Sequence, residues 1–521
     1  MKLLLITGLL AEKIVKTYAK KSGIETDILA LKVPVAALLT IKQINKFLKK
    51  IVVKKFDMIL IPGLVRGDTI SITDSVGIPT FKGPRYAADL PTVLSYLNHV
   101  ELSTSIPACV LLKKELKQKA LQELEAVEKN KDILLKKPGN MLIGELAVGK
   151  DFPMRVMAEI VDAALMTNDE IQRLAKNFVE NGADIIDVGM VAGGARPLDA
   201  KRAVEAIKKV VDVPVSIDSL DPNEIKEAVM AGADLILSVD SGNLNKVATL
   251  SSEVAAVVIP TNQSKGYFPQ KIEDRVYFLE KIINRANKLG MKKLLGDLIL
   301  EPLNVLNSML AFRKFSIRNP EIPIFVGVSN VTELIDADSV GVNALLAKLS
   351  SEVNASIILA TEKSCKAKGT VREEVIAAKM MFLAKSRESV PKDLGIDLLV
   401  LKDKHNHEEK YDNTIEKNAR VIIANNNIDN KILHSEGSFR IIINRKEKSI
   451  IVFHFVKNNM EKANLVIKGK NPEKIYCEIF KIGLIKNVNH AAYLGRELAK
   501  AEIALKTGKE YMQDMAVFNK I

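Results

Sequence analysis

Eight short apolar runs alternate with amphipathic helical segments between about residues 140 and 388, and this alternation restricts the fold more than any other feature. The runs are PMRVMAEIVDA, ADIIDVG, VPVSID, DLILSV, VAAVVIP, KKLLGDLIL, IPIFVGV and ASIILA. Their lengths predict buried strands, and several of the helical segments stop at a glycine, as at Gly182, Gly232 and Gly290. Eight such units in about 240 residues favour an α/β chain with a central (β/α)8 TIM barrel over an open sheet.

Two strands of this pattern end in carboxylates within one strand–helix–strand unit, residues 184–218. Asp187 closes ADIIDVG and Asp218 closes VPVSID. Parallel strands collect ligands beyond their carboxyl ends, where both acids are expected. A single isolated acid would be explained equally well as a cap of the following loop or helix. Two acids in register favour a ligand site.

The flanking regions predict two further domains. Residues 1–138 show a small doubly wound, Rossmann-like α/β pattern, followed by a charged helix and the boundary at Pro138-Gly139. The first turn, TGLLAEK, has one glycine where a dinucleotide fingerprint has three, so no nucleotide is assigned. The loop GLVRGD could face a phosphate, although an ordinary surface turn explains it better. The barrel is assigned to residues 139–390.

Residues 391–521 are expected to form a C-terminal α+β domain. Its first part, 402–418, is polar and predicts a linker or exposed loop, in which His405 and His407 lack further metal ligands. A hairpin pattern, FRIIINRKEKSIIVFHF, then precedes NLVIKG and two helices. The last helix is predicted to begin at Asn489 as N-cap and to stop at Gly508, with Glu502 and Lys506 as a favourable pair.

Composition excludes several classes of protein. The net charge is +13 and the pI about 9.2, but lysines and acids are interleaved and Trp is absent, so no nucleic-acid partner is expected. No apolar run reaches the roughly 18 residues of a membrane span, and no signal-peptide pattern is present, which predicts a cytoplasmic protein without a membrane partner. All six histidines lie outside residues 100–400, which excludes a histidine base or ligand in the central region. The three cysteines lie far apart and predict neither disulfides nor a zinc site.

Polar residues recur at the ends of successive predicted strands. They are Glu159 or Asp162, Asp187, Asp218, Ser238, Asn262, Asp297 and Asn330. Carboxylates accept pairs of parallel hydrogen bonds and amides both donate and accept, so such a ring suits a flat heterocycle with N–H donors and ring acceptors, as in a pterin. Solvation of an exposed barrel rim would also use acids, but their recurrence at strand ends favours a binding site.

At these residues the sequence resembles the pterin-binding enzyme family, which includes dihydropteroate synthases and methyltetrahydrofolate–corrinoid methyltransferases. The resemblance covers roughly residues 150–350 and rests on ADIIDVG…ARP, SIDS, GDLILEP and GVSNVTEL. It implies that Asp218, Asp297 and Asn330 hold the pyrimidine edge of a pterin. It also implies that Arg196 faces a diphosphate or the second substrate, beside a loop in which Gly193 and Gly194 let backbone amides approach an anion.

The chain also departs from the family pattern. Leu237 replaces the fourth-strand asparagine and leaves Ser238 as the nearest polar group, and Gly194-Ala195 stands where the synthases have Ser-Thr. The eighth strand offers Thr361, Glu362 and Lys363 in place of Arg-x-His. These departures leave pterin binding in place and count against p-aminobenzoate as second substrate. The three-part layout resembles archaeal dihydropteroate-synthase-related proteins, which implies a role near tetrahydromethanopterin or folate metabolism.

Three functions follow from the resemblance. The leading hypothesis is a synthase-type transferase that joins a dihydropterin methyl diphosphate to an arylamine or a related acceptor, with Arg196 and Asp187 as catalytic residues and Mg²⁺ held by Glu159 or Asp162. The first alternative is methyl transfer from a methylated pterin to a corrinoid or another acceptor. The second is a non-catalytic pterin carrier or assembly scaffold. The resemblance further implies a homodimer.

Overall fold

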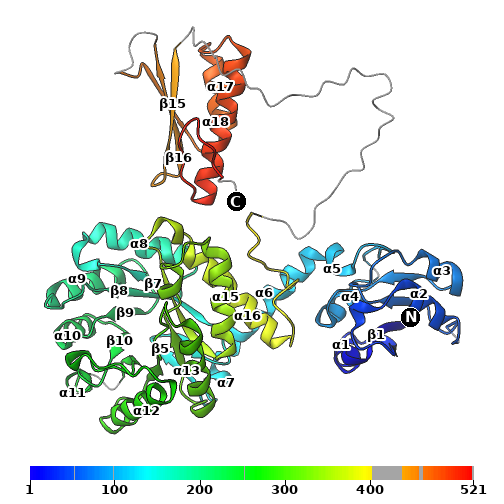
Figure 1. The fold of residues 1–521 in the computed structure, drawn as a ribbon, viewed down its shortest axis with the longest axis horizontal. Coiled ribbons are helices and arrows are strands. Elements are labelled where there is room, and N and C mark those ends of the chain that lie inside the picture. Colours follow the sequence, from blue (N-terminus) through cyan, green and yellow to red (C-terminus); the bar gives the residue numbers. More distant parts are fainter. Residues whose placement is uncertain (52, 98, 251–252, 402–436, 457–461, 519–521) are drawn as a thin grey trace. The chain divides into compact units, whose positions relative to one another are not determined.

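A computed structural model describes residues 1–51, 53–97, 99–250, 253–401, 437–456 and 462–518 (Figure 1). The chain divides into two units, Met1–Lys402 and Asp403–Ile521, and each is described by itself. The predicted linker at 402–418, with His405 and His407, lies outside the described residues.

The first unit begins with a four-stranded parallel sheet in the order β2-β1-β3-β4. Its strands are β1 (Lys2–Gly8), β2 (Glu25–Leu31), β3 (Met58–Ile61) and β4 (Thr80–Lys82). Its helices are α1 (Glu12–Lys20), α2 (Ile41–Leu48), α3 (Ile70–Val76), α4 (Leu90–Ser95), α5 (Ala108–Leu111), α6 (Lys113–Lys129) and α7 (Lys131–Leu134). Along β1, Leu3 and Leu5 enter one apolar core and Leu4 and Ile6 enter another. Both faces of the sheet are therefore covered, which confirms the doubly wound pattern.

Eight parallel strands form the closed barrel that the alternation predicts. They are β7 (Arg155–Ile160), β8 (Ile185–Gly189), β9 (Val215–Asp218), β10 (Leu235–Val239), β11 (Ala255–Val258), β12 (Leu294–Gly296), β13 (Ile324–Val326) and β14 (Ala355–Thr361). The surrounding helices are α8 (Asn168–Glu180), α9 (Pro197–Lys208), α10 (Pro222–Met230), α11 (Leu244–Val247), α12 (Ile272–Lys288), α13 (Val305–Arg318), α14 (Ser329–Thr332), α15 (Ser339–Glu352) and α16 (Thr370–Ser386). Gly182, Gly232 and Gly290 follow α8, α10 and α12 with φ of +98°, +98° and +94°, which confirms the predicted helix stops.

A short antiparallel hairpin, β5 (Asn140–Ile143) and β6 (Leu146–Gly149), precedes the barrel and was not anticipated from the sequence. Ile143 and Val148 are fully buried in the same apolar cluster as the inward-facing barrel residues Leu235 and Phe325. Arg155, the first residue of β7, donates its Nε–H to the Ala147 carbonyl at 2.8 Å. The hairpin therefore closes the amino end of the barrel.

The second unit is the predicted α+β domain. Its antiparallel sheet has the order β15 (Ser438–Asn444), β16 (Ser449–Phe455), β17 (Leu465–Gly469), and its helices are α17 (Pro472–Lys481) and α18 (Val488–Thr507). The N-cap of α18 is Asn487 and not Asn489, because the Asn487 side chain accepts the Asn489 N–H. The predicted stop at Gly508 is confirmed by its left-handed backbone.

None of the helices in the described part of the chain is both long and apolar enough to span a membrane.

Candidate active site at the carboxyl end of the barrel

Four carboxylates lie at the carboxyl end of the barrel because the strands alternate. Glu159 and Asp218 lie at the carboxyl ends of β7 and β9, Asp187 lies in β8 two residues before its last residue, and Asp297 directly follows β12. Side chains two residues apart on a strand share a face, and the residues two positions before Glu159 and Asp187 are Met157 and Ile185, both in the barrel interior. The acids therefore continue the inward-facing rows beyond the apolar layers.

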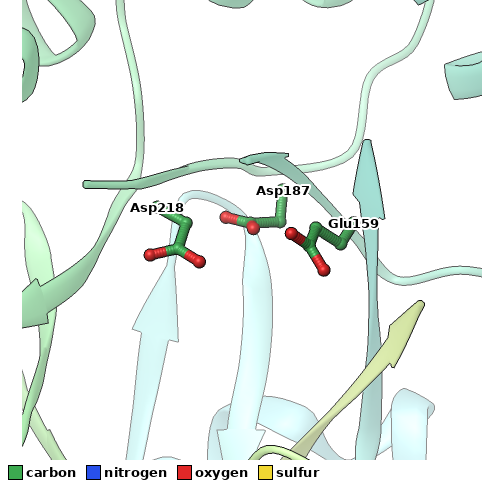
Figure 2. Close-up of side chains that lie close together, drawn as sticks. All are labelled: Glu159, Asp187 and Asp218. Atoms are coloured by element: carbon green, nitrogen blue, oxygen red, sulfur yellow. The ribbon is translucent and has the colours of Figure 1, made fainter. Parts of the chain in front are cut away.

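Three of these carboxylates form one cluster. Glu159, Asp187 and Asp218 each offer an oxygen, and these oxygens lie within 4.8 Å of one another. Figure 2 shows the three carboxyl groups gathered side by side at the strand ends. Asp187 is fully buried, its Oδ1 accepts a hydrogen bond from the Ser216 hydroxyl, and its Oδ2 has no hydrogen-bond partner. Glu159 Oε2 accepts a hydrogen bond from Thr361 Oγ1 at 2.7 Å.

Burial and mutual repulsion raise the pKa values of the cluster. Burial, followed by the charges of Asp218 and Glu159, raises the pKa of Asp187 well above its ordinary value. Burial, with Glu159 and Asp297 nearby, raises the pKa of Asp218 to about 7. Burial also raises the pKa of Glu159, against the opposing effects of the Thr361 hydroxyl and Lys363. Without a bound cation or a hydrogen-bond donor, the cluster therefore favours partial protonation near neutral pH.

Gly189 makes room for the cluster. A Cβ atom on Gly189 would lie 2.6 Å from Glu159 Oε1 and 3.1 Å from the Ile160 carbonyl oxygen. Any side chain at this position would therefore push the Glu159 carboxylate out of its place beside Asp187.

Asp297 is held apart from this cluster by its own loop. Its Oδ1 accepts the Ile299 N–H at 2.7 Å, and its side chain is nearly buried. Burial raises the pKa of Asp297 to about 7, although the Ile299 amide and Arg275 act in the opposite direction. Asp297 therefore keeps one carboxylate oxygen available beside the mouth of the barrel.

Arg275 on α12 supports that loop and was missed by sequence reasoning. Its guanidinium is buried, donates to the carbonyls of Pro269 at 3.2 Å and Leu298 at 3.4 Å, and lies 4.4 Å from the centre of the Phe268 ring. It thereby joins the loops that follow β11 and β12. No local pattern could reveal this role, because the contacts come from residues distant in sequence.

The predicted amide and hydroxyl groups lie at the same end of the barrel in different surroundings. Ser238 is buried in β10, and Asn262 follows β11, where its Oδ1 accepts a hydrogen bond from Ser264 Oγ at 2.7 Å. Asn330 at the start of α14 is exposed and donates from Nδ2 to the Leu300 carbonyl at 3.2 Å. The Asn330 contact ties the loop after β13 to the loop after Asp297.

The glycine-rich loop after β8 already uses two of its backbone amides. Gly193 and Gly194 have φ of +107° and +68°. The Ala195 N–H donates to Asp221 Oδ2 at 3.3 Å, and the Arg196 N–H donates to Glu224 Oε1 at 2.9 Å. These two amides therefore bind carboxylates of the chain itself.

Arg196, proposed from the sequence to face a diphosphate, and Asp162, proposed as a possible Mg²⁺ ligand, also lie on this rim. The Arg196 guanidinium is 44% exposed and lies 3.8 Å from an oxygen of Asp199. Asp162 pairs with Lys363 at 3.2 Å and is separate from the cluster that contains Glu159. Among the described residues, the carboxylates with the spacing of metal ligands are those of Glu159, Asp187 and Asp218.

The site as a whole combines buried acceptors with few positive charges. None of the ion pairs formed within the described ranges involves the carboxylates of Glu159, Asp187 or Asp218. Such a site suits N–H donors of a planar heterocycle or a hard cation with oxygen ligands.

Three family matches divide the chain in the same way as the fold. Residues 160–369 match the family described as pterin binding enzyme, residues 433–514 match PterinBD-DUF4346, and residues 1–85 match a family of unknown function, DUF6513. The pterin binding match covers Asp187, Asp218 and Asp297 and begins one residue after Glu159.

Individual relatives and a solved structure are similar to this chain over different parts of its length. The uncharacterized protein MJ0107 of Methanocaldococcus jannaschii is 41% identical over 532 residues, covering 99% of each chain. A dihydropteroate synthase of Clostridium beijerinckii is 30% identical over 140 residues, 24% of this chain and 51% of that one. The solved dihydropteroate synthase from Xanthomonas albilineans in complex with 7,8-dihydropteroate shares 18% identity and a TM-score of 0.39 over 48% of this chain and 99% of that one. With its full-length relative and its barrel match together, the chain belongs to the pterin-binding enzyme family.

Proposed function

We propose that the chain is a pterin-dependent transferase of the dihydropteroate synthase type, acting in tetrahydromethanopterin or folate biosynthesis. The observation that carries the proposal is the pair of nearly buried carboxylates Asp218 and Asp297 at the mouth of a barrel that matches the pterin binding enzymes. The resemblance further supports a homodimer.

Asp218 and Asp297 are suited to the amidine-like edge of a pterin. A carboxylate accepts two parallel N–H bonds from such an edge, and burial strengthens them because water does not compete. Since the pKa values of both groups are raised to about 7, donors on the ligand would favour the charged form. Pterin binding should therefore strengthen as the pH rises through about 7.

The transfer itself requires positioning and charge neutralisation. The nitrogen of an arylamine would attack the methylene carbon of the dihydropterin, the carbon–oxygen bond to diphosphate would break with both electrons going to the diphosphate, and the new secondary amine would give its proton to solvent. The exposed guanidinium of Arg196 would meet the departing diphosphate at the rim. The buried Asp187, whose pKa is raised by burial and by the charges of Asp218 and Glu159, would hold a proton beside the reacting groups.

A Mg²⁺ ion fits the donor set at this end of the barrel, because Asp187 Oδ2 is buried without a hydrogen-bond partner. Glu159, which lies beside this oxygen, would hold the ion; Asp162, the other candidate ligand, pairs with Lys363. The ion would supply additional positive charge to the leaving diphosphate.

The test is calorimetric titration of the protein with a dihydropterin and with a methylated tetrahydropterin, in parallel with Asp297→Asn. Binding that weakens strongly in the variant supports the pterin site. Formation of a pterin–arylamine product from the dihydropterin methyl diphosphate then supports the synthase reaction, whereas binding without turnover would leave a carrier. Absence of binding to either pterin contradicts the proposal.

Methyl transfer is a second candidate, and the raised pKa of Asp297 at the mouth of the barrel favours it. When a methyl group leaves a pterin nitrogen, that nitrogen must receive a proton, and Asp297, whose pKa is raised to about 7, can hold a proton near neutral pH. The amides of Ala195 and Arg196, which could bind a diphosphate, already bind carboxylates. A requirement for a corrinoid acceptor would distinguish methyl transfer from synthase chemistry.

A further inference from the structure

The loop that carries Asp297, residues 297–301, has a backbone conformation that its own sequence does not favour. Ile299 has φ of +65°, in the left-handed region, which a β-branched residue rarely adopts because its Cβ crowds the backbone. Asp297 Oδ1 accepts the Ile299 N–H at 2.7 Å, so the place of this carboxylate depends on the backbone at Ile299. Contacts from outside the loop are therefore needed to hold it.

Arg275 on α12 supplies such contacts. Its Nη1 donates to the carbonyls of Leu298 at 3.4 Å and Ile299 at 3.5 Å, and its Nη2 donates to the Glu301 carboxylate. Its Nε donates to the Pro269 carbonyl at 3.2 Å, in the loop after β11, and the side chain is buried. A planar guanidinium with five donors in fixed directions can join all these acceptors, whereas the ammonium group of a lysine cannot.

Arg275 is also the cation that opposes the effect of burial on Asp297. Burial raises the pKa of Asp297 to about 7, and the charge of Arg275 acts in the opposite direction. Two other acids lie near this pair: Asp218 on β9, which Asp297 repels, and Glu301, which is paired with Arg275. Loss of the Arg275 charge would therefore raise the pKa of Asp297 further.

We propose that Arg275 is a positioning residue of the pterin site, which holds the Asp297 loop in its left-handed turn and so fixes the carboxylate that receives the ligand. Arg275 acts through Asp297, because its own guanidinium donates to backbone carbonyls and to Glu301. The inference rests on the proposed function, in which Asp297 binds the pterin. The effect of Arg275 on the charge of Asp297 exists without any pterin and can be measured separately.

Two substitutions separate the position of the loop from the charge beside it. Arg275→Lys keeps the charge and loses the planar fork, so pterin affinity should fall about tenfold at every pH, with little change in the midpoint of its pH dependence. Arg275→Met loses both, so affinity should fall at least as far and the midpoint should rise by about one pH unit. Calorimetric titration of the full-length protein with a dihydropterin between pH 6 and pH 9 measures both quantities.

The matched control lies on the same helix. Arg285 is exposed and donates to Asn245 Oδ1 at 2.9 Å, so Arg285→Lys should leave the affinity and the midpoint within about twofold and a few tenths of a pH unit.

Glycine provides a rescue, because it adopts the left-handed conformation without the penalty of a side chain. Arg275→Lys combined with Ile299→Gly should recover part of the affinity that Arg275→Lys loses. If Arg275 only stabilises the fold, the folded variants will keep the affinity and the midpoint of the wild type, and glycine will recover nothing. Either result overturns the proposal. If Arg275→Met does not fold, Arg275→Lys and its glycine rescue decide the question.

The ionisation of Asp297 is followed without pterin by carbon-13 NMR of the aspartate carboxyl groups, with Asp297→Asn to identify the signal. The pKa of Asp297 should be higher in Arg275→Met than in the wild type. If the wild type binds neither a dihydropterin nor a methylated tetrahydropterin, the proposed function fails even where this rise in pKa is observed. Normal pterin binding by the wild type, with the same Asp297 pKa in both proteins, overturns the role of Arg275 alone.

Discussion

At the amino end of the barrel the hairpin buries Ile143 and Val148 against apolar side chains, whereas at the carboxyl end the same strands present Glu159, Asp187 and Asp218 to one another. The amino end gains stability by removing apolar surface from water. The carboxyl end loses stability, since it buries acids whose charges repel. Stability and binding are thus concentrated at opposite ends of one set of strands, which allows each to be tested without the other.

The largest expected effect is a loss of stability at the amino end of the barrel, which the hairpin closes. Ile143→Ala should lower the free energy of unfolding by about 2–5 kcal/mol, because it leaves a cavity among fully buried side chains. Urea denaturation followed by circular dichroism measures this loss. Pterin affinity of the folded variant should stay within about twofold of the wild type. A large loss of affinity would show that the two ends are coupled.

A loss of pterin affinity is expected at the carboxyl end of the barrel. Asp297→Asn and Asn330→Ala should each weaken pterin binding by about 1–3 kcal/mol, because each leaves a ligand group without its partner. Calorimetry measures the change.

A matched control for these acids lies near the amino end of β9. Asp212→Asn makes the same chemical change at an exposed residue before β9, and Asp218→Asn makes it at the carboxyl end of that strand. Only Asp218→Asn should weaken pterin binding. Equal effects of the two variants would contradict a site at the strand ends.

Stability should also depend on pH because of the buried acids at the carboxyl end of the barrel. The pKa values of Asp218 and Asp297 are raised to about 7 in the folded chain, so the folded state holds more protons than the unfolded state between about pH 4 and pH 7. The free energy of unfolding should therefore fall as the pH rises through this window, by up to about 4 kcal/mol for each of the two groups. Urea titrations at pH 5 and pH 8 measure this difference, which Asp218→Asn should reduce. A wild-type stability that rises with pH in this window would contradict the buried, repelling acids.

The smallest expected contrast lies within a single strand, β14. Ser356 near its amino end is fully buried and its hydroxyl has no hydrogen-bond partner, whereas Thr361 at its carboxyl end donates to Glu159. Ser356→Ala should be neutral or slightly stabilising, and Thr361→Val should cost about 0.5–1.5 kcal/mol. Thermal unfolding of both variants at pH 8 compares them, and a larger loss in Ser356→Ala would reverse the assignment.

The sequence alone was sufficient to predict the barrel and to identify most of the acids at its mouth. The period-2 alternation in DIIDVG and VSID places Asp187 and Asp218 on the inward face at the strand ends, and the strand–helix alternation closes the sheet. Both signals are local, because they depend on side-chain spacing along one element. The same alternation could have identified Ser216, which lies two residues before Asp218, as a neighbour of the site.

Only the tertiary structure decided which acids act together. It gathers Glu159 with Asp187 and Asp218, pairs Asp162 with Lys363, commits the Ala195 and Arg196 amides to carboxylates, and places Arg275 under the loop that follows Asp297. It also revealed the hairpin that closes the amino end, whose strands of four residues are too short for a pattern of their own. These features depend on the closure of the barrel, which brings β7 beside β8 and β14 and joins residues about 200 positions apart in sequence, as in the bond from Thr361 to Glu159. Sequence spacing records the direction of a side chain along its own strand, and the partner that the side chain meets is set by how the strands are arranged around the barrel.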